Sequence, residues 1–235
     1  MAGIVSVCFN IAVCIGVPIT ALVFVGKRWK GGVKLFFIGV GTFFISQICI
    51  RQPVFAVLQQ TAWFQAFSAQ HMVAFYFLLA LTAGLAEECA RYIAFRLLKK
   101  FPEPETAVPL CCGLGHGGFE AFLIGINNLL LLVLSEYLSQ LGWAAALAGV
   151  ERLSTMLVHV AFSFIVYRAV RSKRLRFLLL AILLHTVCDF SIILVQYGLP
   201  AIAMEGILLA YALILIFAVL KTEKRGNIAS NTPQN

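Results

Sequence analysis

Charged side chains are scarce in this chain. Asp, Glu, Lys and Arg together make up 12% of the 235 residues, whereas about a quarter of a typical soluble domain is charged. Hydrophobic residues reach 61%, and the mean hydropathy is +0.95. The apolar runs are long and lack the alternation of strands, so helices are expected to satisfy their backbone polar groups in a membrane. The composition excludes a soluble domain and predicts an all-α, polytopic transmembrane helical bundle.

The sequence also lacks the motifs of several functional classes. Its seven cysteines form no CxxC pair and no zinc-finger spacing, and most lie in apolar runs, where cysteine acts as a small hydrophobe. The adjacent Cys111 and Cys112 are expected to lie, reduced, in a cytoplasmic loop. The formal net charge is +8, but the basic residues stand in short runs between apolar segments. That distribution is typical of membrane topology signals and argues against a nucleic-acid partner.

Seven apolar segments are long enough to cross a bilayer. The predicted spans cover residues 4–26, 34–57, 72–98, 118–139, 150–168, 176–197 and 200–220. The first has no basic residues before it and no small-residue cleavage site after it, so we expect it to remain as a helix. The spans form a single transmembrane domain, 1–222, followed by a polar cytoplasmic tail, 223–235, that is expected to be disordered.

The basic residues orient the spans. Fifteen of the 18 follow the first, third, fifth or seventh span, and loops rich in Lys and Arg are typically cytoplasmic. This pattern puts the N-terminus outside and the C-terminus in the cytoplasm. Of the other three, Arg51 is expected to snorkel to the outer interface, while Arg91 and Arg152 stand beside acidic residues. We expect a multi-pass protein of the plasma membrane, in contact with membrane lipid.

Ionisable residues inside a span are costly and usually mark function. The third span carries Glu87, Glu88 and Arg91 in the run GluGluCysAlaArg. At spacings of three and four on a helix, one guanidinium can reach both carboxylates. A purely structural ion pair needs only one acid, so the second acid favours a functional role.

Two further spans carry ionisable groups at the same depth. His159 lies in the fifth span, and His185 and Asp189 lie four residues apart on one face of the sixth. Each histidine is nine residues from the basic residue at the cytoplasmic end of its span, and Glu88 is 11 residues from Lys99. At 1.5 Å per residue these distances correspond to about 13–17 Å. Three helices are therefore expected to present acids and imidazoles to one layer near the midplane.

Other polar residues lie nearer the ends of the predicted spans. Glu151 and Arg152 stand at the outer end of the fifth span. The fourth begins with GlyHisGlyGlyPheGlu, in which His116 and Glu120 are four residues apart, and Asn127 follows on the same broad face. From this position near the cytoplasmic surface, a loop contact, a substrate gate and a direct part in chemistry all remain open.

Carboxylates and imidazoles in one pocket are the groups that activate water for attack on an amide. A glutamate can serve as general base, and histidines, alone or with a metal, can polarise water or stabilise the oxyanion. The motifs of other intramembrane proteases are absent: the chain has no HExxH, no GxSG and no GlyXaaGlyAsp sequence.

Four short motifs, in order, resemble the YhfC family of intramembrane metalloproteases. They are GluGluCysAlaArg, GlyHisGlyGlyPheGlu, the segment from Glu151 to His159, and HisThrValCysAspPhe; SerGlnIleCysIleArgGlnPro at 46–53 is also similar to the family's second span. That family is grouped with the CAAX prenyl endopeptidases, the PrsW proteases and the APH-1 subunit of gamma-secretase. The resemblance covers nearly the whole chain and implies a membrane-embedded peptidase that acts on a membrane protein or peptide, in a bacterial plasma membrane.

The resemblance also implies roles for individual residues. By comparison with the CAAX enzymes, Glu87 or its neighbour Glu88 is the base, His159 its partner, and His185 with Asp189 the last pair. This chain has EExxR where those enzymes have EExxxR, and it has Asp189 where they have Asn. Because Asp binds metals better than Asn, His159, His185 and Asp189 are candidate zinc ligands, although a site without a cofactor remains open.

Two non-proteolytic functions remain open at this stage. One is a membrane scaffold or chaperone of the APH-1 type, which keeps polar residues for packing. The other is a proton-coupled transporter, because buried Glu, His and Asp residues also relay protons. The chain shows no inverted repeat, which disfavours transport.

Overall fold

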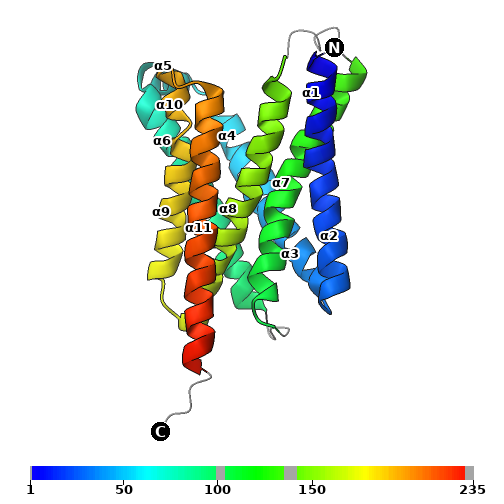
Figure 1. Ribbon diagram of the computed structural model, residues 1–235. Helices are drawn as coiled ribbons and strands as arrows, with labels where there is room; N and C mark the ends of the chain where they lie inside the picture. The colour runs from blue at the N-terminus through cyan, green and yellow to red at the C-terminus, as the bar shows by residue number, and fades with distance from the viewer. Residues whose placement is uncertain (1, 99–103, 135–141, 231–235) are drawn as a thin grey trace.

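The computed structural model describes residues 2–98, 104–134 and 142–230, and these are helical apart from short connections. Seven of the helical segments in these ranges are long and apolar enough to cross a membrane. They run through Ala2–Arg28, Gly32–Leu58, Met72–Leu97, Ala107–Leu130, Ala144–Ser172, Arg176–Gln196 and Ala201–Lys224. The predicted all-α transmembrane bundle is confirmed. Its first helix starts at one end of the bundle and its last helix ends at the other (Figure 1).

The first two spans are each built from three consecutive helical pieces. Span one contains α1 (Ala2–Ile11), the π-helical segment η1 (Ala12–Gly16) and α2 (Val17–Arg28). Span two contains α3 (Gly32–Phe43), the π-helical segment η2 (Phe44–Arg51) and α4 (Gln52–Leu58). Single π-turns inside α-helices are frequent at functional sites, and η2 contributes two residues to the site described below.

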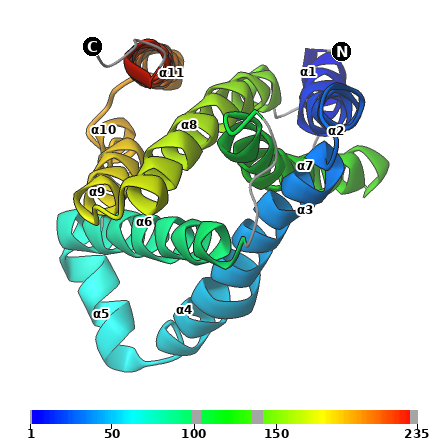
Figure 2. The same cartoon turned by 90° about the horizontal axis from the view of Figure 1, so that it is seen from below.

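The remaining helices complete the bundle. They are α5 (Ala62–Gln70), α6 (Met72–Leu97), α7 (Ala107–Leu134), α8 (Ala144–Ser172), α9 (Arg176–Phe190), α10 (Ile193–Gln196) and α11 (Ala201–Ser230). Seen along the bundle axis, α8 crosses the middle, with α6 and α9 at one end and α7 at the other, while α4 and α5 lie at the periphery (Figure 2). Helices α7 and α8 are the most buried spans, and they carry several residues of the site described below.

Glycines let α7 approach both of its neighbours closely. A Cβ atom on Gly115 would lie 1.9 Å from the carbonyl oxygen of Phe36 in α3, and one on Gly39 would lie 2.0 Å from that of Cys112 in α7. On the other side, a Cβ on Gly113 would lie 2.5 Å from the Cα of Val160 in α8. Small residues permit this backbone-to-backbone packing in membrane bundles. The close packing fixes α7 between α3 and α8.

The fourth span begins at Ala107, well before the predicted start at 118. Its first turn contains Pro109, which a helix tolerates there, and the glycines that lower its hydropathy are the ones that pack. Cys111 and Cys112 are therefore buried in a helix and do not lie in a loop. The predicted end of this span at 139 lies outside the described residues.

The last helix also differs from its predicted extent. Helix α11 continues through Ser230, although a disordered tail was expected from 223. Lys, Glu and Arg at 221–225 are good helix formers, so the helix extends past the end of the apolar segment. The last part of the predicted tail, 231–235, lies outside the described residues.

Candidate active site

Three imidazoles from three helices face one oxygen of Glu87. Oε2 of Glu87, on α6, lies 2.8 Å from Nε2 of His116 on α7, 3.9 Å from Nδ1 of His159 on α8 and 3.8 Å from Nε2 of His185 on α9. All four side chains are buried. The depth argument predicted that Glu88, His159 and His185 share a layer, and the structure places Glu88 beside His185 and brings the adjacent Glu87 to both imidazoles. His116 joins them because α7 starts earlier than its hydropathy indicates.

Each imidazole forms a hydrogen bond through the ring nitrogen that does not face Glu87. The partners are Thr42 for His116 (Oγ1–Nδ1, 2.8 Å), Glu120 for His159 (Oε2–Nε2, 2.9 Å) and Glu88 for His185 (Oε1–Nδ1, 2.7 Å). Metal-binding histidines characteristically bond a carboxylate, a carbonyl or water through the nitrogen that does not face the metal, which fixes the ring. In this cluster the held nitrogens point away from Glu87, and the other three point toward it.

Arg91 neutralises one acid of the Glu–Glu pair. Its Nη1 forms an ion pair with Oε2 of Glu88, and both side chains are almost fully buried. Among the ion pairs of the described residues Arg91 has none with Glu87, so the expectation that one guanidinium reaches both carboxylates is wrong. The two acids point to different partners, because Glu87 turns toward His116 and Glu88 toward Arg91 and His185.

Arg91 also approaches His159. Its Nη2 lies 3.4 Å from Nδ1 of His159. A guanidinium only donates, so Nδ1 is an acceptor and the proton of the neutral ring sits on Nε2, which donates to Glu120. The Nδ1 lone pair is thus directed to Arg91, and Nδ1 lies 3.9 Å from Oε2 of Glu87.

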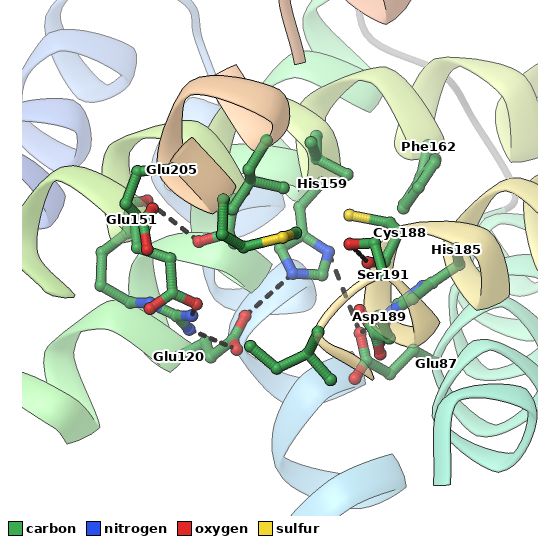
Figure 3. Close-up of a pocket in the computed structure, with 16 residues that line it drawn as sticks. Glu87, Glu120, Glu151, His159, Phe162, His185, Cys188, Asp189, Ser191 and Glu205 are labelled. Carbon is green, nitrogen blue, oxygen red and sulfur yellow. Dashed lines mark hydrogen bonds and ion pairs between the residues drawn. The ribbon is translucent and has the colours of Figure 1, made fainter. Parts of the chain in front are cut away.

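Arg152 joins two carboxylates at the other side of the site. It forms ion pairs with Glu120, at 2.7 Å, and with Glu151. Glu120 therefore links Arg152 to His159, and it lies in the cluster and not near the cytoplasmic surface. Figure 3 shows the His159 ring between Glu120 on one side and Glu87 on the other.

A cavity of about 290 Å³ opens onto these groups. It is bounded by α8, α9 and α11, and its walls combine the polar residues with apolar ones such as Phe162 and Leu208. Asp189 lies on its wall with 40% of its side chain exposed, and its Oδ2 is 3.4 Å from Nε2 of His185. A second cavity, of about 340 Å³, lies between η2, α4 and α6 and shares Glu87, Glu120, Asp189 and Ile192 with the first. The carboxylates can thus be reached from two sides.

Asn127 is not part of this arrangement. It is exposed on α7 and lines neither cavity. The neighbouring Asn128 points into the bundle, where its Nδ2 donates to Oδ1 of Asn10 at 2.8 Å. Of the residues that the sequence assigned to the fourth span, His116 and Glu120 are in the cluster and Asn127 is outside it.

Two site residues on η2 were not predicted. Gln47 is buried and donates from Nε2 to Oε1 of Glu87 at 2.5 Å, while Arg51 donates to Oε1 of Gln47 at 3.0 Å. Arg51 also donates to the carbonyl of Leu79, at 2.7 Å, and to Oγ1 of Thr82. It therefore points inward and does not snorkel. The only signal in the sequence was the polar run SerGln…ArgGln in an apolar span.

The donor atoms in the cluster fit a transition-metal ion. Two groups bring their donor atoms within 4.8 Å of one another: Glu87, His116 and His159 form one, and Glu87, Glu88 and His185 form the other. Imidazole nitrogen with carboxylate oxygen is the ligand set typical of zinc sites. Asp189, a ligand candidate from the sequence, belongs to neither group.

Comparison with known proteins gives an independent result. The sequence model of the family described as "YhfC intramembrane metalloprotease" matches residues 13–142 and 127–211. The chain is also 28% identical to the uncharacterized membrane protein YhfC of Bacillus subtilis (strain 168), over 94% of this chain and 97% of that protein. No solved structure matches the chain. The family match covers most of the sequence and agrees with the motifs, the bundle of seven apolar spans and the donor set: the chain belongs to the YhfC intramembrane metalloprotease family.

Proposed function

We propose that this protein is a membrane-embedded metallopeptidase that hydrolyses a peptide bond of a membrane protein or peptide, with Glu87 as the general base. The observation that carries the proposal is the approach of three imidazole nitrogens to Oε2 of Glu87. Burying a carboxylate and three imidazoles among apolar helices is costly unless the groups bind or react. The family description supports the same class of function.

His116, His159 and His185 would hold the metal through the nitrogens that face Glu87. Zinc suits this donor set, and when bound it supplies a Lewis acid that polarises the scissile carbonyl and makes water more acidic. Thr42, Glu120 and Glu88 hold the rings in place from behind. This ligand set differs from the set of His159, His185 and Asp189 that the sequence favoured, because His116 Nε2 lies 2.8 Å from Oε2 of Glu87 whereas Asp189 belongs to neither group of converging donors.

The two oxygens of Glu87 have different surroundings. Oε1 accepts a hydrogen bond from Gln47, while Oε2 faces the imidazoles. In the proposed reaction Oε2 takes a proton from the attacking water and then passes it to the leaving amine nitrogen, as a general base that becomes a general acid. Glu88 does not compete for this role, because Arg91 and His185 occupy its oxygens.

The remaining polar residues have supporting roles in this proposal. Glu120 orients His159, and Arg152 neutralises Glu120 and Glu151. Asp189 lies beside His185 on the cavity wall, where an extended segment of substrate can contact it. Two cavities have Glu87 in their walls, which supports access of such a segment to the base.

The first test is metal content, followed by peptide cleavage. Purified wild type would be compared with His159→Ala, His185→Ala and Glu87→Gln in detergent, with monodispersity as the folding criterion. His71→Ala is the matched control, because His71 is exposed at the start of α6 and lies outside the cluster. We expect about one zinc per chain, lost in the first two variants and kept in the control.

The second arm uses a library of apolar peptides of about 20 residues, the length that spans a bilayer, reconstituted with the protein in liposomes. We expect wild type to cleave members of the library and Glu87→Gln to be folded, zinc-bound and inactive. Zinc without cleavage of any peptide by wild type would favour a scaffold. Cleavage by zinc-free protein would support the proposed peptidase activity and contradict the proposed role of a metal in it.

A further inference from the structure

Glu205 is an acidic residue of the last span that lines the cavity leading to Glu87. It is the fifth residue of α11, and it shares the cavity wall with Glu151 and Arg152 of α8. Figure 3 shows Glu205 and Glu151 on the side of His159 that faces away from Glu87. An ionisable residue inside a span is costly and usually marks function, so this end of the cavity needs a physical explanation.

Two polar atoms in this wall are buried and have no hydrogen-bond partner among the described residues. They are Oε2 of Glu205, which can only accept, and Nε of Arg152, which can only donate. Arg152 is 8% exposed, and its two terminal nitrogens already bind Glu120 and Glu151. Buried polar groups are rarely left unpaired. A free acceptor and a free donor in one cavity wall therefore indicate a ligand that supplies the opposite of each.

The charges at this end of the cavity favour a cation beside Glu205. Glu120, Glu151 and Glu205 bring three carboxylates, whereas Arg152 is the only Lys or Arg among the residues that line this cavity. One guanidinium cannot balance three carboxylates. The positive end of the α11 dipole contributes little, because its effect falls off within the first turn and Glu205 lies beyond it.

We propose that Glu205 is a specificity-determining residue that binds an ammonium group of the substrate, while Nε of Arg152 donates to a backbone carbonyl of the same segment. A peptide supplies both groups, since an ammonium donates and a carbonyl accepts. The ammonium can belong to a lysine side chain or to a free N-terminus. This substrate class rests on the proposed peptidase function, but binding of the peptide requires neither a metal nor cleavage.

The test measures peptide binding to Glu87→Gln protein, in which no peptide should be cleaved. The probes are apolar peptides of about 20 residues with a fluorophore at the C-terminus. One series is N-acetylated and carries a single lysine at successive positions, the second has norleucine in place of the lysine, and the third has norleucine and a free N-terminus. Fluorescence anisotropy in detergent gives each Kd. We expect a lysine peptide or the free N-terminus to bind about 10- to 100-fold more tightly than the acetylated norleucine peptide, and the series that gains affinity identifies the source of the ammonium.

The role of Glu205 is tested by adding a second substitution to this protein, with monodispersity as the folding criterion. Glu205→Gln should bring the Kd values of the series within about threefold of one another, and Glu205→Lys should favour a peptide with glutamate in place of the lysine. Glu223→Gln is the control and should keep the preference. Glu223 lies on the same helix, 18 residues and about 27 Å further along, and lines neither cavity.

Equal Kd values for all peptides, before any change at Glu205, overturn the proposal. A preference for the ammonium that survives Glu205→Gln overturns it as well. If wild type binds no zinc and cleaves none of the peptides, but the preference depends on Glu205, the proposed function is wrong and the cation-binding role of Glu205 stands.

Discussion

The side-chain amide of Gln47 donates a 2.5 Å hydrogen bond to Oε1 of Glu87. The orientation of the amide is fixed by Arg51, which can only donate and is 3.0 Å from the amide oxygen of Gln47. The amide nitrogen must therefore face the carboxylate. This contact differentiates the two oxygens of Glu87 and leaves Oε2 to face the three imidazoles.

Replacing Gln47 with leucine should reduce peptide turnover. The substitution introduces an apolar side chain of similar size and removes the donor, so the Gln47 hydrogen bond to Oε1 of Glu87 is lost. A hydrogen bond to a charged group contributes about 1.5–3 kcal/mol, which corresponds to a loss of roughly 10- to 150-fold in kcat. Steady-state cleavage of a library peptide in liposomes measures this, with zinc content expected to stay at the wild-type level. Gln52→Leu is the control, because Gln52 lines the second cavity together with Gln47 but is exposed. Equal losses of turnover in both variants would argue against a specific role for Gln47.

Replacing Glu120 with glutamine should weaken metal binding. Glu120 accepts from Nε2 of His159 and pairs with Arg152, and a neutral amide is a poorer acceptor for both. Loss of such an orienting carboxylate is expected to lower zinc affinity by about 10-fold or more. Glu151→Gln provides the comparison, because Glu151 also pairs with Arg152 but has no imidazole partner among the bonds of the described residues. Chelator competition on both variants distinguishes them, and similar affinities would assign the effect to Arg152 alone.

The sequence predicts the bundle and part of the site for clear physical reasons. Long apolar runs identify the membrane spans, and charged residues within such a run are readily recognised as candidate site residues. Glu88, His159 and His185 also lie at a countable distance from basic residues that mark the membrane surface. These side chains lie close together in the structure, as the shared depth indicates.

The parts that the sequence did not predict have equally physical causes. His116 was assigned to the cytoplasmic surface because the glycines around it lower the hydropathy of a segment that is in fact deeply buried. Those glycines serve helix packing, which a hydropathy scale does not measure. Gln47 and Thr42 are uncharged, and nothing in a single sequence separates such residues from ordinary polar residues of a span. Their roles follow only from contacts between helices distant in sequence.

The packing role of the glycines can be tested through stability. In Gly115→Ala the new Cβ would lie 1.9 Å from the carbonyl oxygen of Phe36, so α3 and α7 must separate. Overpacking of this kind typically costs about 1–3 kcal/mol, and a clash with backbone belongs at the upper end. In Gly41→Ala, a matched change in α3, the new Cβ meets nothing within 4 Å, and stability should change by about 1 kcal/mol or less. Thermal unfolding in detergent should show a clear drop in Tm for Gly115→Ala alone; comparable values for the two variants would mean that α3 and α7 can move apart freely.

Metal removal should destabilise the folded protein, because the proposed ligands come from three different helices. His116, His159 and His185 lie on α7, α8 and α9, so a bound ion would add a link between helices to their packing and to the contact of Glu120 with His159. A ligand that binds the folded state alone at 100 times its Kd stabilises it by about 2.7 kcal/mol. We expect a chelator to lower Tm, buffered free zinc to restore it in a concentration-dependent manner, and His71→Ala to behave like wild type. In His185→Ala the response to zinc should be largely lost, because one of the three helices is no longer joined. A Tm that is independent of zinc in wild type would show that the imidazoles are held by Thr42, Glu120 and Glu88 without a metal, and would favour catalysis by Glu87-activated water.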